Sequence, residues 1–142
     1  MNLRSFLKTL LLGAFFCSAQ AISAAETIHS ITFGSAGGFT GGGATYKLNS
    51  DGTLTGETFA LPTKKKPLPT RNIEKSQVDE IFKEAAELNT HTYHKPSNMT
   101  RTLHIAFEGH TQRNVWGVGD TKIDARVNRL FSKLMELTRD AK

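Results

Sequence analysis

The sequence predicts an α+β domain in which a single antiparallel sheet of about five strands carries two amphipathic helices on one face. Two observations support this prediction. Segments with alternating apolar and polar residues come in two groups with short turns between them, and a segment with apolar residues at helical spacing follows each group. The order is therefore strand, strand, strand, helix, strand, strand, helix. Strands joined by short turns pair antiparallel, and each helix needs an apolar surface to cover.

The N-terminus differs from the rest of the chain. Two cations without an acid precede the apolar run 10–16, and small residues follow it, which is the order of a secretory signal peptide. The run is shorter than the ~20 residues that a membrane-spanning helix needs. We expect cleavage after Ala21 or Ala25 and removal of the signal within residues 1–25. Residues 26–142 would then form a single α+β domain without a transmembrane segment, in the periplasm or outside the cell.

Composition supports an exported globular domain. The chain has 142 residues, of which 38% are hydrophobic and 22% charged, as is ordinary for one folded domain. Its only cysteine, Cys17, lies in the signal, so the mature domain is cysteine-free and has no disulfide. Phe16 stands directly before Cys17, where a lipoprotein signal carries a small residue, so we expect no lipid anchor. The net charge of +5 does not by itself indicate nucleic acid, and we expect no nucleic-acid partner.

The first three strands are expected over residues 27–33, 44–48 and 53–60. The first is rich in β-branched and aromatic residues, and the second alternates Ala44, Tyr46 and Leu48 with polar residues. The glycine-rich segment 34–43 connects the first two strands. Residues 49–52, Asn-Ser-Asp-Gly, form the turn before the third, because these residue types tolerate positive φ.

Residues 61–71 hold three prolines and four cations and are expected to form an extended connector that does not enter the sheet. The first helix follows it. Ser76 is the expected N-cap, with Asp79 three residues later as in a capping box. Apolar residues then recur on one face as far as Leu88, and Asn89 can end the helix.

Two more strands are expected over 100–107 and 112–118, with a turn between them. The last helix is expected to start near Thr121, with Asp124 at the third position of its cap. The apolar faces of all these elements define the expected core, which consists of Ile31, Phe33, Tyr46, Leu48, Ile81, Phe82, Leu103, Ile105, Phe107, Trp116, Leu130, Phe131 and Leu134.

Three segments of the mature chain carry a resemblance: 33–41 with its Phe-Gly and Gly-Phe-Thr-Gly, 96–99 with Pro-Ser-Asn-Met, and Trp-Gly at 116–117. Together they resemble a family of small exported bacterial proteins and lipoproteins of unassigned function. Serine stands at position 97 where the family pattern has glycine, and the lipid-carrying cysteine is absent. The resemblance implies a bacterial source and an envelope location, and it carries over no catalytic residues.

The glycine-rich segment has the spacing of a phosphate-binding loop between Gly38 and Gly43, but Ala44 stands where that motif requires lysine. The segment also leads into a strand, so no helix N-terminus points at an anion. We interpret it as a mobile hairpin loop or a site of close backbone packing. Phe39, with Gly41 and Gly42 beside it, is a candidate contact for a partner.

His91 and His94 are candidate metal ligands because they stand three apart in an expected loop. Zinc needs three or four ligands, and no known zinc signature includes these two residues, so the alternative is two surface histidines. No nucleophile elbow is present, and paired carboxylates cannot be chosen from the sequence. We therefore expect no enzyme activity and no cofactor.

Basic residues form two candidate contacts for an anionic surface. Lys64, Lys65 and Lys66 lie in the expected connector, and Arg126 and Arg129 lie on the polar side of the last helix. The alternative is that both groups are ordinary solvated faces.

The sequence therefore favours a non-catalytic binding protein of the inhibitor, immunity or accessory type, with another envelope or extracellular protein as its expected partner. The alternative is a small-ligand or metal-ion binding protein of the cell envelope.

Overall fold

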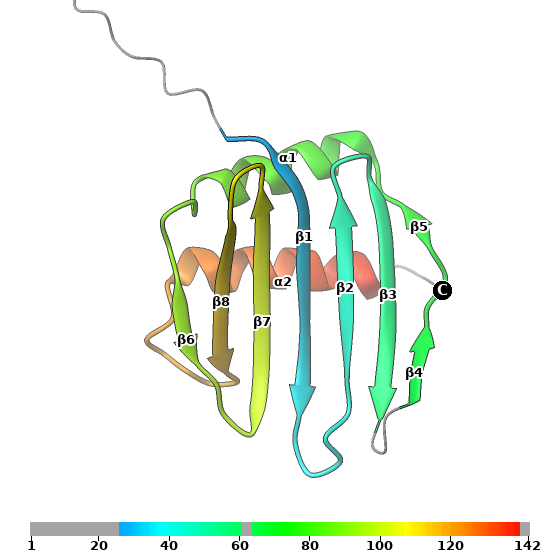
Figure 1. Ribbon diagram of the computed structural model, residues 1–142, viewed down its shortest axis with the longest axis vertical. Helices are drawn as coiled ribbons and strands as arrows, with labels where there is room; N and C mark the ends of the chain where they lie inside the picture. Colours follow the sequence, from blue (N-terminus) through cyan, green and yellow to red (C-terminus); the bar gives the residue numbers. More distant parts are fainter. Residues whose placement is uncertain (1–25, 61–63, 140–142) are drawn as a thin grey trace, which may run out of the picture.

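A computed structural model describes residues 26–60 and 64–139. The expected signal peptide and its cleavage sites lie outside the described residues. The chain forms one mixed sheet of eight strands with two helices on one of its faces (Figure 1). The broad α+β class is correct, but the prediction of a single antiparallel sheet of five strands is wrong.

Five long strands form the middle of the sheet, in the order β3-β2-β1-β7-β8, and each is antiparallel to its neighbours. The central strand β1 pairs with β2 on one side and with β7 on the other, which joins the two halves of the sequence. These strands are β1 (Ile28–Gly37), β2 (Gly43–Asn49), β3 (Thr53–Ala60), β7 (Met99–Phe107) and β8 (Thr111–Gly117).

The remaining strands are short and lie at the two margins. β4 (Lys64–Pro67) and β5 (Arg71–Asn72) both pair with β3, so the segment expected to be a connector outside the sheet adds two strands to it. β6 (Tyr93–Lys95) pairs with β8 in parallel, which makes the sheet mixed. The residues of these strands show no strand pattern of their own. The strands form because the exposed edges of β3 and β8 offer backbone hydrogen-bonding partners. Short edges rich in lysine also discourage pairing with another chain.

Both helices begin at residues other than those expected. α1 (Lys75–Ala86) follows Glu74, no side chain caps it, and Ser76 lies inside its first turn. α2 (Ala125–Arg139) begins after Asp124, whose Oδ1 accepts a hydrogen bond from the backbone N–H of Arg126 at 2.8 Å. Asp124 is therefore the residue that caps α2, in the way acidic N-caps commonly do.

The core lies between the sheet and the helices. Of the residues expected there, Tyr46 and Phe82 are partly buried and the others are buried. The ring of Trp116 meets the ring of Phe131 edge-on, with their centroids 5.2 Å apart, and so joins β8 to α2. Among the described residues no helix covers the opposite face of the sheet (Figure 1).

Candidate interaction surface at one end of the sheet

Phe39 stands at the tip of a tightly bonded hairpin between β1 and β2. The N–H of Gly37 donates to the carbonyl of Gly42 at 3.0 Å, and the N–H of Gly41 donates to the carbonyl of Gly38 at 3.2 Å. Positive φ angles at Gly38 and Gly41 allow this turn. The side chain of Phe39 is fully exposed, with a relative accessibility of 107%. An apolar ring is thus held out into solvent by a defined backbone.

The hairpin rests against the segment that leads into β7. The N–H of Gly38 donates to the carbonyl of Asn98 at 2.8 Å. A Cβ on Gly37 would lie 1.9 Å from that same oxygen, so only glycine allows the two backbones to approach this closely. The glycines therefore provide close backbone packing, one of the two interpretations that the sequence left open.

Two further apolar side chains are exposed beside the hairpin. Met99 opens β7 and Val118 follows β8, with 42% and 47% of their surface exposed. The N–H of Val118 donates to the carbonyl of Met99 at 2.8 Å. Since β1, β7 and β8 are neighbours about 4.8 Å apart, the ends of these strands lie within roughly 10 Å. In the part of the chain that the structure describes, Phe39, Met99 and Val118 are the exposed large hydrophobic residues, and all belong to this end of the sheet, at the bottom of Figure 1.

We call these residues, Phe39, Met99 and Val118, the Phe39 end. Segments 33–41, 96–99 and 116–117 meet here. Beyond the contact of Gly38 with Asn98, a Cβ on Gly117 would lie 2.4 Å from Oγ of Ser97, so these residues are packed directly together. The hydroxyl of Ser97 donates to the carbonyl of Met99 at 2.8 Å. Segments distant in the sequence thus form one continuous surface.

Lysines flank the Phe39 end on both sides. Lys64 and Lys65 pair with the last residues of β3, which places the start of β4 at the same end of the sheet as the hairpin. On the other side, Lys95 pairs with Trp116 near the end of β8, and Lys122 lies in the loop that follows. Together with Lys66 these side chains are exposed, and we call them the flanking lysines: Lys64, Lys65, Lys66, Lys95 and Lys122.

Two carboxylates near the flanking lysines are already engaged. Glu57 forms an ion pair with Lys65 at 2.9 Å. Asp120 accepts hydrogen bonds from the N–H of Lys122 and from the Tyr93 hydroxyl, both at 2.8 Å. These bonds lower the pKa of Asp120, first through the Lys122 amide and then through Tyr93, so the carboxylate stays charged. The lysines still outnumber the acids at this end.

A hollow of about 370 Å³ opens next to Val118. Small residues and charged residues line it together: Lys95, Pro96, Ser97, Gly117, Val118, Gly119, Asp120, Thr121 and Lys122. It is a shallow depression and continues the surface of the Phe39 end toward β6.

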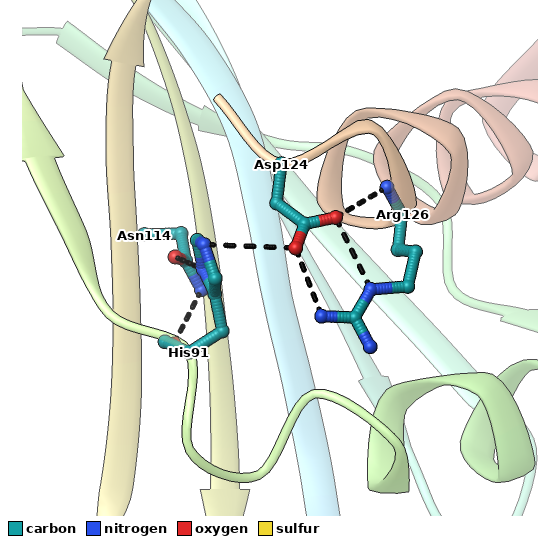
Figure 2. A network of polar contacts seen from close by, with 4 residues as sticks. All are labelled: His91, Asn114, Asp124 and Arg126. Carbon is teal, nitrogen blue, oxygen red and sulfur yellow. Dashed lines mark hydrogen bonds and ion pairs between the residues drawn. The ribbon is translucent and has the colours of Figure 1, made fainter. Parts of the chain in front are cut away.

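The two histidines expected as metal ligands have different surroundings, and Figure 2 shows those of His91. Nδ1 of His91 lies 2.8 Å from Oδ1 of Asn114, which is completely buried, and Nε2 of His91 lies 3.9 Å from Oδ2 of Asp124. The amide of Asn114 also donates to the carbonyl of His91 at 3.3 Å. His94 lies in β6 opposite Val115 and is exposed. Within residues 26–60 and 64–139, no group of three or more potential ligands could hold a metal ion.

Arg126 belongs to the same polar network (Figure 2). Its guanidinium and its backbone N–H both bond to Asp124, and these bonds are the largest cause of the low pKa of Asp124, which is about 2. Burial raises this pKa, and the nearby His91 lowers it. Arg126 and Arg129 line a small hollow with Glu84 and Glu87 of the α1 region. They lie in the helical layer and do not join the flanking lysines. The sequence contains no spacing that would have paired His91 with Asn114 and Asp124.

Comparison of the chain with protein-family models and with curated protein sequences finds no match. Neither helix in the described part of the chain is long and apolar enough to cross a membrane.

Proposed function

We propose that this chain is a non-catalytic binding protein that works outside the cytoplasm and engages another component of the cell envelope through the Phe39 end. The observation that carries the proposal is the complete exposure of Phe39 on a hydrogen-bonded turn. Burying a phenylalanine side chain in an interface stabilises the complex by about 1.5–3 kcal/mol. Because backbone hydrogen bonds already hold the turn in one shape, we expect little conformational freedom to be lost on docking.

The surroundings of the histidines support a non-catalytic role. His91 contacts a buried amide and a carboxylate, and this arrangement connects the loop after α1 to β8 and to the start of α2. Metal binding through His91 and His94 receives less support than docking, because both ring nitrogens of His91 already face polar partners.

The test is photo-crosslinking of the exported protein in the cells that produce it. One variant carries a benzophenone side chain in place of Phe39, and a matched control carries it in place of Glu108, in the hairpin at the opposite end of the sheet. We expect adducts from position 39 that position 108 does not form. Equal labelling from both positions, or none from position 39, would contradict the proposal.

A further inference from the structure

The Phe39 end is a row of apolar side chains at the ends of three neighbouring strands in the middle of the sheet. Phe39, Met99 and Val118 come from three separate segments at the ends of neighbouring strands. The hollow that adjoins Val118 is shallow, and the ends of the three strands lie within roughly 10 Å of one another. We therefore expect a broad surface to reach all three side chains.

The flanking lysines lie far apart. They begin in β4 at one margin of the sheet and continue to β6 and Lys122 at the other, a path of six strand spacings or about 29 Å. A partner that complements both groups must present negative charge over this whole width. A single acidic pocket would be too small.

Charge is also divided between the two ends of the molecule. Glu26, Asp51 and Glu108 lie at the end opposite the Phe39 end, where β1 and β3 begin and where β7 turns into β8. Lys75 lies beside Asp51 but is paired with Asp79, so acids still predominate at this end. A negative surface therefore attracts the lysine-bearing end and repels the other. This separation of charge would orient the molecule with Phe39 toward the surface before contact.

From these observations we infer that the Phe39 end docks on the surface of a phospholipid bilayer that carries anionic headgroups. The inference rests on the proposed function and names the partner of the same site. Phe39, Met99 and Val118 enter the boundary between headgroups and acyl chains, as apolar side chains of interfacial proteins do. The flanking lysines remain at headgroup level, since their long stems can lie along apolar material while the ammonium groups stay in water.

The experiment is co-sedimentation of the exported, processed protein with vesicles. One set contains equal parts of phosphatidylcholine and phosphatidylglycerol, and the other contains phosphatidylcholine alone. We expect binding to the anionic vesicles, weaker binding as salt is raised, and little binding to the neutral ones. Failure to bind the anionic vesicles at low salt would overturn the inference.

Variants separate the apolar from the electrostatic contribution. Phe39→Ser should weaken binding to the anionic vesicles by about tenfold or more, from the apolar surface it removes. Lys95→Gln should weaken it about fivefold, the effect of one cation near an anionic surface. Lys83→Gln is the matched control, because it removes the same charge from α1. If Lys83→Gln weakened binding as much as Lys95→Gln, adhesion would be non-specific and the inference would be wrong.

A fluorescence measurement reports the depth of position 39. In Phe39→Trp the added indole should shift its emission to the blue with anionic vesicles, whereas Trp116 is 1% exposed and should stay constant. Glu108→Trp is the control and should not shift. Protein adducts from position 39 together with no vesicle binding would leave the proposed function standing and replace the bilayer with a protein partner.

Discussion

The backbone N–H of Gly38 donates a hydrogen bond of 2.8 Å to the carbonyl of Asn98. This bond fastens the β1–β2 hairpin to the segment before β7, and it places Gly38 so close to Met99 that a Cβ would meet the Met99 sulfur at 2.8 Å. Phe39 is the next residue. Its position beside Met99 is therefore set by packing of main chain and not by contacts of its own ring.

The first prediction concerns the glycines of this region. Gly37→Ala adds a Cβ that meets the Asn98 carbonyl at 1.9 Å, and its φ of 114° is unfavourable for any residue with a side chain. In Gly119→Ala the φ of 85° is also strained, but the added Cβ would meet no other atom within 4 Å. Gly109→Ala has neither problem.

Urea unfolding should rank these variants. We expect Gly109→Ala to stay within about 0.5 kcal/mol of the parent protein, Gly119→Ala to lose about 1 kcal/mol and Gly37→Ala to lose more than about 2 kcal/mol. If Gly37→Ala were no worse than Gly119→Ala, the close approach to Asn98 would not matter for stability.

The second prediction concerns two buried amides in β8. The side chain of Gln112 is 3% exposed, and neither of its polar atoms has a hydrogen-bond partner within the described part of the chain. Gln112→Met should raise the free energy of unfolding by about 1 kcal/mol, because an unpaired buried amide is costly. Asn114→Leu should lower it by about 1–3 kcal/mol, since it removes both contacts with His91. Thermal unfolding of both variants checks the contrast, and a lower melting temperature for Gln112→Met would contradict it.

The third prediction concerns pH. The pKa of Asp124 in the folded protein is about 2, below its ordinary value of 3.8, chiefly because of its bonds to Arg126. A lowered pKa contributes stability that is complete above about pH 4 and is lost as pH falls toward 2. Asp124→Asn should therefore cost about 1 kcal/mol at neutral pH. The difference from the parent protein should shrink between pH 4 and pH 2. A difference that does not change with pH in denaturant titrations would show that the carboxylate charge is unimportant.

The fourth prediction concerns Trp116, the only tryptophan of the chain. Phe131 meets it edge-on and also lies under the guanidinium of Arg101, 5.3 Å from the ring centroid. Phe131→Leu keeps an apolar side chain but removes both aromatic contacts, so it should cost about 1–2 kcal/mol. Met135→Leu, on the same helix, is the matched control and should change stability by less than about 1 kcal/mol. Trp116 fluorescence during unfolding provides the measurement, and equal losses in both variants would argue against the aromatic contribution.

The sequence predicted elements whose apolar pattern matches their own geometry. Residue pattern and type located the five long strands, although β1 continues to Gly37, inside the segment expected to be a loop. Apolar stripes identified both helices, because each of them buries one face. The prediction failed for β4, which is exposed throughout, and for β6, in which only Tyr93 is partly buried, because neither strand shows such a pattern. These strands exist because a neighbouring edge offers backbone partners, which is a property of the folded sheet. The same limit applies to the start of α2, where Asp124 and not Thr121 provides the cap.

For the candidate site, the sequence singled out Phe39 and the triple lysine as separate features. It offered no way to see that Met99, Val118, Lys95 and Lys122 lie at the same end, since register decides this. Nor did it separate the flanking lysines from Arg126 and Arg129. The sequence alone does not distinguish one group of basic residues from another. Only the tertiary structure shows that the flanking lysines lie with the sheet and that the arginines lie in the helical layer.

By itself, then, the sequence determined the long strands, the two helices and the residues whose side chains are buried in the core, because hydrophobic periodicity is a local property. The tertiary structure alone decided the order β4-β3-β2-β1-β7-β8-β6 and the parallel pairing of β6. It also decided which loops share an end of the sheet. The reason is that strand pairing is made by backbone groups common to all residues, so partners are chosen by how the whole chain packs.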